Sequence, residues 1–262
     1  EERAKNGELL GEIEDSINEM NNTLKRLYKQ LYSPFFGSFI FKQDSTEDID
    51  EYYVGVYNLL KKDSKIPLVC DWRAPISSVY YDYGIEKAKY TAPCGEITGE
   101  VLGKKQYKIE NSILKTEVDS ETTLADNMLI EALSENASDK MKTIVSTIQK
   151  EQNKIIRTDD RQNILVQGVA GSGKSSIALH RVAYLLYANK NTLKAEDILI
   201  ISPNKMFSEY IAAVLPELGE ENILQVDYKT LAESELRDLH IKIEERTEML
   251  DDVVSPNATR LN

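Results

Sequence analysis

Residues 166–176, VQGVAGSGKSS, combine glycines, a lysine and serines at a spacing that suits a phosphate chain. The run fits the pattern G-x-x-x-x-G-K-S/T at every fixed position, which Gly168, Gly173, Lys174 and Ser175 occupy. The glycines let the backbone curl so that successive N–H groups point at phosphate oxygens. Lys174 is then expected to reach the β and γ phosphates, and the Ser175 hydroxyl to bind Mg²⁺. The run predicts a nucleoside triphosphate site with Lys174 and Ser175 as candidate catalytic residues and Ser175 as the candidate metal ligand.

Hydrolysis of the nucleotide would also need carboxylates, one to hold Mg²⁺ and one to orient the attacking water. The only Asp-Glu dipeptide is Asp50–Glu51, which precedes the loop and begins a predicted strand. Asp227 ends the apolar run NILQV and is a candidate Mg²⁺ ligand of a compact P-loop enzyme, although no Glu follows it. We therefore expect this chain to bind nucleotide with negligible turnover.

The elements around the loop alternate between strand and helix. After Arg161, apolar runs of strand length are each followed by a helical pattern, and this alternation predicts a parallel sheet with helices on its faces. Because the apolar runs are continuous, the strands are expected to be buried on both sides. The predicted strands are 163–167, 197–202 and 222–226, and the predicted helices are 174–189, 205–215 and a polar stretch after the third strand.

Residues 35–118 differ in character, because aromatic and β-branched residues dominate between Gly, Pro and Asn. The pattern predicts short strands and hairpins in a small antiparallel sheet or barrel. Two helical patterns follow at 121–138 and 138–157, with Ser138 as the expected N-cap of the second. The predicted strand segments are FFGSFIF, EYYVGVYNLL, IPLVCDW, ISSVYYDYG, EITGEVLG and KQYKIENSILKTEV.

Apolar residues near the start of the chain recur at alternating spacings of three and four. This spacing predicts the seam of a coiled coil, and an amphipathic helix docked on a globular domain is the alternative. The helix is expected to stop at residues 33–37, SPFFG, because Pro34 cannot continue it and Gly37 permits a turn. This apolar stripe consists of Leu10, Ile13, Ile17, Met20, Leu24, Leu27 and Leu31.

Three segments together resemble the HelD family of superfamily 1 helicase-like ATPases: DWRAPISSVYYD (71–82), YTAPCGEITGE (90–100) and ILVQGVAGSGKSSIALHRVAYLLY (164–187). The resemblance runs from about residue 9 to about residue 231 and implies a motor that releases and recycles bacterial RNA polymerase, uses ATP and Mg²⁺, and contacts nucleic acid in the full-length protein. It also implies a coiled-coil arm that probes the polymerase secondary channel, with the apolar stripe on its returning half. The implied organisation is α/β: a coiled-coil arm helix at 1–33, a small β-rich domain at 34–119, and helices followed by the first part of a RecA-like P-loop motor domain at 120–262.

Superfamily 1 helicases carry a glutamine upstream of the loop that recognises the adenine edge, and Gln152 stands at that place before Gly168. A carboxamide suits this task because it offers a donor and an acceptor together. The alternative is that Gln152 is simply solvated on a polar helix face. Residues 198–211, ILIISPNKMFSEYI, resemble the next motif of the superfamily, which touches single-stranded nucleic acid. The candidate nucleotide-binding residues are Gln152, Gly168, Ala170, Gly171, Ser172, Gly173, Lys174, Ser175 and Ser176.

The run DWRAP at 71–75 is favoured as a structural element over a catalytic one. Trp72 is expected to fill a core, Arg73 to satisfy buried carbonyls or a carboxylate, and Pro75 to fix a turn.

Composition narrows the classes of partner. Thirty-two basic and 44 acidic residues give a net charge of −12, which disfavours a broad nucleic-acid surface but not a local basic channel. No apolar run approaches the roughly 20 residues that span a bilayer, and the start EERAKNGELL is charged, so we expect no membrane association and a cytoplasmic location. Cys70 and Cys94 stand far apart without a Cys or His at ligand spacing, which predicts two reduced thiols rather than a zinc site or a disulfide.

Two alternatives to the RNA polymerase motor stay open. One is an ATP-dependent DNA helicase of the UvrD/Rep type, which the net acidity weakly disfavours. The other is a nucleotide-responsive interaction module whose fold, rather than turnover, matters. Because the chain begins with Glu1 rather than Met, we also expect it to be a fragment of a longer protein.

Overall fold

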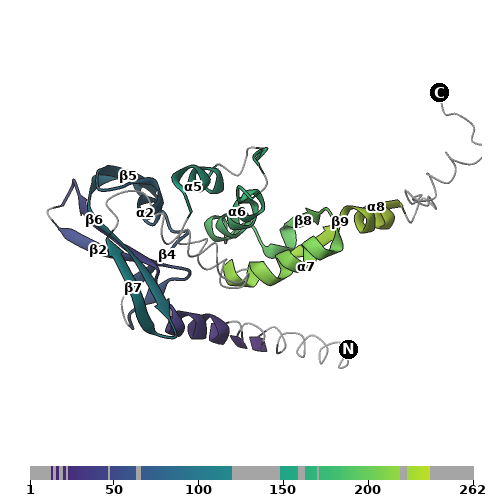
Figure 1. Cartoon of the computed structure of the whole chain (residues 1–262), viewed down its shortest axis with the longest axis horizontal. Coiled ribbons are helices and arrows are strands. Elements are labelled where there is room, and N and C mark those ends of the chain that lie inside the picture. Colours follow the sequence, from purple (N-terminus) through teal and green to yellow (C-terminus); the bar gives the residue numbers. More distant parts are fainter. Residues whose placement is uncertain are drawn as a thin grey trace, which may run out of the picture. The chain divides into compact units, whose positions relative to one another are not determined.

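The computed structural model divides into two compact units, Glu1–Lys194 with Val214–Glu221 and Ala195–Ala213 with Asn222–Asn262 (Figure 1). Ser138, the predicted helix at 121–138 and Ala170 of the loop lie outside the residues that the structure describes. Within the described ranges, no helix is both long and apolar enough to cross a membrane. The described residues are 13, 16–17, 20–21, 23–46, 48–62, 66–119, 148–158, 163–169, 171–218 and 223–236.

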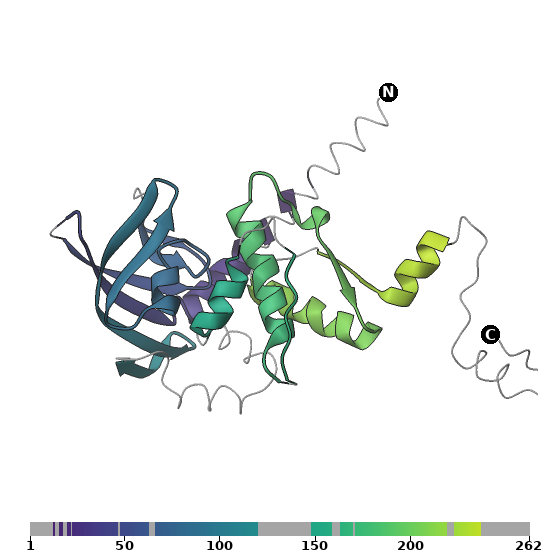
Figure 2. The ribbon, with the colours of Figure 1, turned by 90° about the horizontal axis from the view of Figure 1, so that it is seen from above.

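The first unit contains a seven-stranded sheet in the order β3-β4-β2-β1-β6-β5, with β7 also paired to β6 (Figure 2). The pairs are antiparallel, as predicted, except for β2 and β4, which run parallel. The long strand β6 pairs with β1 along one edge, and β5 and β7 share its other edge. The strands are β1 (Gly37–Gln43), β2 (Ile49–Gly55), β3 (Leu59–Leu60), β4 (Pro67–Asp71), β5 (Lys87–Ala92), β6 (Gly95–Glu110) and β7 (Ile113–Asp119).

The aromatic and β-branched residues that predicted these strands form the core of the sheet. Phe39 and Phe41 of β1 point to the same face, because side chains alternate along a strand, and both are almost fully buried. Val54 of β2 and Val101 of β6 are buried as well. Burial of such side chains typically contributes about 1.5 to 3 kcal/mol each, so this core is the main source of stability of the sheet.

The prediction of a strand at 76–84 is wrong, because Ser78–Asp82 form the short helix α2. The segment starts as a series of tight turns, in which the backbone N–H of Ala74 bonds to the carbonyl of Asp71 and that of Ser78 to the carbonyl of Pro75. Its β-forming residues Val79, Tyr80 and Tyr81 are all buried. Three consecutive residues cannot face one side of a strand, so their common burial favours the helix over their strand propensity.

Residues 13, 16–17, 20–21 and 23–32 are helical, and the described residues of the apolar stripe are exposed; Leu10 lies outside the described ranges. The described members of the stripe are Ile13, Ile17, Met20, Leu24, Leu27 and Leu31, each between 48% and 67% exposed. The stripe is therefore open to another surface, and the coiled coil stays a prediction.

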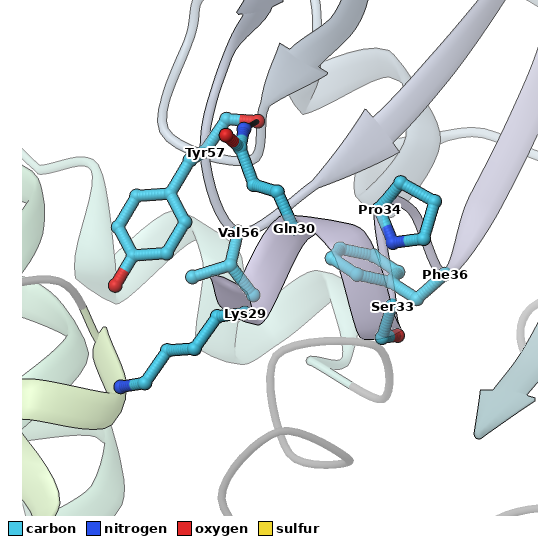
Figure 3. Close-up of a pocket in the computed structure, with 7 residues that line it drawn as sticks. All are labelled: Lys29, Gln30, Ser33, Pro34, Phe36, Val56 and Tyr57. Atoms are coloured by element: carbon cyan, nitrogen blue, oxygen red, sulfur yellow. Dashed lines mark hydrogen bonds between the residues drawn. The ribbon is translucent and has the colours of Figure 1, made fainter. Parts of the chain in front are cut away.

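The C-terminal end of this helix is fixed to the sheet. The Gln30 side chain donates to the carbonyl of Asn58 at 2.8 Å. Ser112 lies in the turn between β6 and β7. Its backbone N–H donates to the carbonyl of Tyr32 at 2.9 Å, and its hydroxyl donates to the carbonyl of Leu31 at 2.8 Å. A cavity of about 50 Å³ lies beside Gln30, between the helix and the segment around Tyr57 (Figure 3). Because the last helical carbonyls have no partners within a helix, these bonds both cap and anchor it.

Two further helices of the first unit flank the loop, α5 (Lys150–Ile156) and α6 (Lys174–Ala188). They pack on each other, and α5 also packs on α2. The helix predicted at 174–189 is confirmed. The one predicted at 138–157 is wrong around 148–149, because these residues are not helical and Gln149 is the N-cap of α5 in an extended conformation.

The second unit contains β8 (Leu199–Ser202) and β9 (Leu224–Asp227), which pair in parallel as the alternation predicted. It also contains η1 (Ala195–Asp197) and α8 (Tyr228–Leu236). The helix α7 (Lys205–Val214) and the turn η2 (Leu215–Leu218) lie between the paired strands in the chain.

The third predicted strand, at 163–167, is not formed, and Leu165 is 92% exposed. The expected burial of both faces is also wrong, because Leu199, Ile201 and Leu224 are exposed. A parallel strand is buried only where further strands flank it and helices cover it, and in the described part of the chain β8 and β9 pair with each other alone. The RecA-like sheet is therefore not confirmed by these residues.

Candidate nucleotide site

Two glycines of the loop have backbone conformations that favour glycine. Gly171 and Gly173 have φ values of 81° and 80°, in the left-handed region that favours glycine. At Gly168 a Cβ atom would lie 2.7 Å from the Ser172 hydroxyl, so a larger residue there would require the Ser172 side chain to move. Gly173 is the N-cap of α6, whose first N–H groups have no partners within the helix. The loop therefore provides the backbone donors and the helix terminus that an anion requires.

Lys174 turns back over this loop. Its Nζ donates to the carbonyl of Val169 at 2.6 Å, so the ammonium lies against the loop backbone instead of extending into solvent. Ser175 is exposed in the first turn of α6. The ammonium of Lys174 therefore lies at the loop, and the Ser175 hydroxyl is accessible at the start of α6.

Gln152 lies beside the loop. Its Oε1 accepts the backbone N–H of Gln149 at 3.1 Å, which caps the start of α5. Its Nε2 lies 3.4 Å from the place where a Cβ atom of Gly173 would be. The side chain is half-buried rather than solvated on an open helix face. An amide donor and acceptor thus stand next to the N-terminus of α6.

Ser176 and His180 form a buried contact in the first turns of α6. The His180 Nδ1 lies 2.6 Å from the carbonyl of Ser176, and because a carbonyl only accepts, Nδ1 carries the proton. The Nε2 atom is buried without a hydrogen-bond partner among the described residues. Burial lowers the pKa of His180 to about 4, so its imidazole is neutral at pH 7.

Arg157 holds the C-terminal end of α5, and the sequence analysis did not single it out. Its Nη2 donates to the carbonyl of Trp72 at 2.6 Å. Its Nη1 donates to the carbonyl of Arg73 at 3.1 Å and to the carbonyl of Ala74 at 3.4 Å. Its guanidinium lies 5.1 Å from the centre of the Tyr184 ring on α6. Burial lowers the pKa of Arg157, and the carbonyl oxygens offset that cost by accepting its donors.

Two other residues help to place α5. Asn153 is fully buried, accepts from Arg157 and donates to the Asp82 carboxylate of α2 at 2.9 Å. Arg181 of α6 donates to three carbonyls at the end of α5, those of Ile155, Ile156 and Thr158. An arginine seven positions after Lys174 in an apolar helix is the signal that could have identified Arg181, because a cation among buried side chains needs acceptors.

The structural interpretation of residues 71–75 is confirmed. Trp72 is fully buried, and its ring meets the edge of His180 at a centroid distance of 5.5 Å. Arg73 forms a buried bidentate pair with Asp71, with donor distances of 2.9 and 2.8 Å, and lies over the Tyr187 ring of α6. The carbonyl of Pro75 accepts in the turn that starts α2. The run thus packs against the helix that carries the loop.

The candidate carboxylates have structural partners. Glu51 of β2 accepts from Ser38 and Tyr53. Asp227 accepts from the backbone N–H of Thr230 at 3.0 Å and from its hydroxyl at 2.8 Å, which caps α8. Within the described ranges no three His, Cys, Asp or Glu side chains gather as a metal site.

The two cysteines carry free thiols, as predicted. Cys70 is buried in β4, where burial raises the pKa of its thiol to about 11, and Cys94 is exposed in the turn between β5 and β6. The raised pKa of Cys70 is the opposite of the depressed pKa that marks a reactive thiolate.

Residues 198–211 begin with β8 and continue into α7. The Asn204 side chain accepts the backbone N–H of Phe207 at 2.9 Å, which caps the start of α7. Met206 and Tyr210 are exposed on this helix. Its contact with nucleic acid stays a prediction.

Comparison with known families defines the class of protein first. Residues 148–253, which contain α5, the loop and β8 to α8, match the UvrD/REP helicase N-terminal domain. The chain is thus a UvrD/Rep-related helicase-like protein of an ATPase family. Residues 1–135, more than half of the chain, match the N-terminal domain of DNA helicase IV HelD. The chain belongs to the HelD family of superfamily 1 helicases, as the sequence predicted. No curated protein matches it.

Proposed function

We propose that residues 168–176 bind ATP with Mg²⁺ and that Gln152 recognises the adenine edge. The observation that carries this proposal is the juxtaposition of the Gln152 amide with Gly173, the N-cap of α6. Adenine offers a donor and an acceptor on one edge, which a carboxamide complements, whereas guanine offers two acceptors there.

Each residue of the loop then has a distinct task. The glycine-shaped backbone and the N-terminus of α6 bind phosphate oxygens, and Lys174 exchanges the Val169 carbonyl for the β and γ phosphates. The Ser175 hydroxyl is the protein ligand of Mg²⁺, which neutralises phosphate charge when it is bound. The roles of Ala170, Ser172 and Ser176 are backbone contacts to the phosphates.

We further propose that the 262-residue chain binds ATP or ADP but turns ATP over negligibly. Turnover needs an oriented water and added positive charge as the γ-phosphoryl departs, and an arginine finger alone is commonly worth about 10³ to 10⁵ in rate. Asp227 is occupied as the cap of α8, and Glu51 is bound within the sheet. This supports binding over the compact P-loop enzyme.

The cellular role that we propose is the ATP-binding portion of a motor that remodels or recycles RNA polymerase. Membership of the HelD family supports it, and so does an exposed apolar stripe on a helix anchored to the sheet, which suits a protein partner. A DNA helicase of the UvrD/Rep type is the alternative, and a nucleotide-responsive interaction module without turnover is the alternative of another class. The net charge of −12 weakly favours a protein partner over a nucleic-acid surface.

Nucleotide titration of the chain tests the proposed site. Lys174→Ala removes a charge-assisted contact worth about 1.5 to 3 kcal/mol, so the affinity for ADP and ATP should fall at least about tenfold. Lys190→Ala is the matched control, because Lys190 is exposed beyond the other end of α6. Steady ATP hydrolysis that Asp227→Asn abolishes would instead establish the compact enzyme.

A second measurement separates the cellular roles. Binding of the chain to core RNA polymerase and to single-stranded and duplex DNA can be compared at the same salt concentration. Charged substitution of the stripe, Ile17→Asp with Leu24→Asp, should weaken polymerase binding and leave DNA binding unchanged. Binding to DNA alone would favour the helicase, and binding to neither would favour the interaction module.

A further inference from the structure

The place of α5 is set by its contacts rather than by its own helical stability. With seven residues it is shorter than an isolated helix that persists in water. Gln152 belongs to this short helix, so whatever fixes α5 also fixes the Gln152 amide relative to Gly173.

Arg157 supplies the contacts that join α5 to the 71–75 segment. Its fork of donors is shared among the carbonyls of Trp72, Arg73 and Ala74, and its remaining Nε donates to Asn153 of α5 itself at 3.0 Å. Because the guanidinium is planar and rigid, these bonds define one position of α5 on the 71–75 segment. A lysine would reach only part of these acceptors.

The helix that carries the phosphate loop is attached to the same segment independently. His180 meets Trp72, and Tyr187 lies under Arg73 at 4.9 Å. Removal of the Arg157 side chain therefore takes the 72–74 carbonyls away from α5, while α6 keeps its own contacts with the segment. The contacts of α5 with Asp82 of α2 and with Arg181 of α6 remain, so we expect α5 to shift rather than to detach.

We propose that Arg157 is a positioning residue of the nucleotide site, which holds Gln152 at the base by fastening α5 to the carbonyls of residues 72–74. This inference rests on the proposed function and deepens it, because it assigns base selectivity to a contact with the segment that follows β4. The segment then supports the nucleotide site through its main-chain carbonyls. A purely structural arginine would lower stability and leave base selectivity unchanged.

The test measures dissociation constants of ATP and GTP for the 262-residue chain and its variants. Arg157→Ala should weaken ATP binding about two- to tenfold, the range of one lost hydrogen bond, with GTP affinity unchanged. The ATP affinity of Arg157→Lys should lie between those of the wild-type chain and Arg157→Ala, because an ammonium group can reach only some of the carbonyls. Arg26→Ala is the control, since Arg26 also lies 5.1 Å from a tyrosine ring, that of Tyr57, but belongs to the helix at 23–32. It should leave the ATP to GTP ratio unchanged.

A double-mutant cycle shows whether Arg157 acts through Gln152. If it does, Gln152→Ala with Arg157→Ala has the same ATP to GTP ratio as Gln152→Ala alone, because the second change has no amide left to displace. Independent effects would multiply and would overturn the proposal.

The outcomes separate this inference from the proposed function. A wild-type chain that binds neither nucleotide overturns both, and so does a wild-type chain that binds ATP and GTP equally. A selective wild-type chain whose ratio is unchanged in Arg157→Ala and Arg157→Lys overturns the positioning role alone. Should Arg157→Ala fail to fold by circular dichroism, Arg157→Lys decides, and an unchanged ratio there rejects the proposal.

Discussion

The amide nitrogen of Gln152 lies 3.4 Å from the position that a Cβ atom would occupy if Gly173 carried one. The start of α5 therefore lies beside the start of α6. Gly173 also has a φ of 80°, which L-residues with a side chain rarely adopt. A side chain at position 173 therefore meets an unfavourable backbone conformation and would also lie in van der Waals contact with the Gln152 amide. Gly171 has nearly the same φ of 81° with nothing within 4 Å of its Cβ position, so only the backbone conformation applies to it.

The pair predicts different results for two alanine substitutions. Gly171→Ala should weaken ATP and GTP binding equally, by the roughly 1 to 2 kcal/mol that left-handed backbone costs a non-glycine residue. Gly173→Ala should do the same and also reduce the preference for ATP, because its methyl group lies against the amide nitrogen of Gln152 and restricts how that amide can turn toward the base. Titration with both nucleotides checks this, and an equal loss of preference in the two variants would contradict it.

Gln152 itself can be divided into donor and acceptor. Gln152→Ala should weaken ATP binding by about 0.5 to 1.5 kcal/mol with little change for GTP. Gln152→Glu keeps an acceptor for the Gln149 N–H, and so keeps the cap of α5, but loses the amide donor. The ATP to GTP ratio should fall in both variants. If the glutamate variant kept the wild-type ratio, the loss in the alanine variant would come from the cap instead.

The loop and its helix could be predicted because their signal is local. Gly171 and Gly173 sit within one short run, their φ values of 81° and 80° favour glycine, and the helix starts directly after them at Lys174. The DWRAP interpretation succeeded for a related reason, since a tryptophan and an arginine beside an aspartate leave few ways to be buried except as a packed ring and an ion pair.

What failed depends on residues distant in the chain. The strand predicted at 76–84 became α2 because the packing of Tyr80 and Tyr81 overrides their propensity. The contacts of Arg157 could not be predicted, because its acceptors are main-chain carbonyls of residues 72–74, which any residue type provides. The strand at 163–167 was predicted from an apolar run, but a strand also needs a paired neighbour, and the described residues provide none.

The Asp71–Arg73 pair should be costly to break. Both side chains are at most 6% exposed, and removing one partner of a buried pair leaves an uncompensated charge, which typically costs about 3 to 5 kcal/mol. Arg73→Ala should therefore lower the free energy of unfolding by an amount of that order in chemical denaturation. Lys105→Ala is the control, because the Lys105–Glu117 pair is 40% and 41% exposed and its loss should change stability far less. Similar losses of stability in both variants would show that burial does not set the contribution of the Asp71–Arg73 pair to the free energy of unfolding.

His180 should make the chain less stable as the pH falls. Burial lowers its folded pKa to about 4, whereas an unfolded histidine titrates near 6.5. Between these values the unfolded state binds a proton that the folded state does not, so stability is lost as the pH falls through 6.5 and is retained above it. From about pH 7.5 to about pH 5 the loss should be about 2 kcal/mol.

His180→Gln can still donate to the Ser176 carbonyl but cannot be protonated. The difference in the free energy of unfolding between the wild-type chain and His180→Gln should therefore shrink by about 2 kcal/mol from about pH 7.5 to about pH 5. His240→Gln, which changes the other of the two histidines, is the control and should keep the wild-type pH dependence. If His240→Gln removed the pH dependence and His180→Gln kept it, the assignment to the buried imidazole beside Trp72 would be wrong.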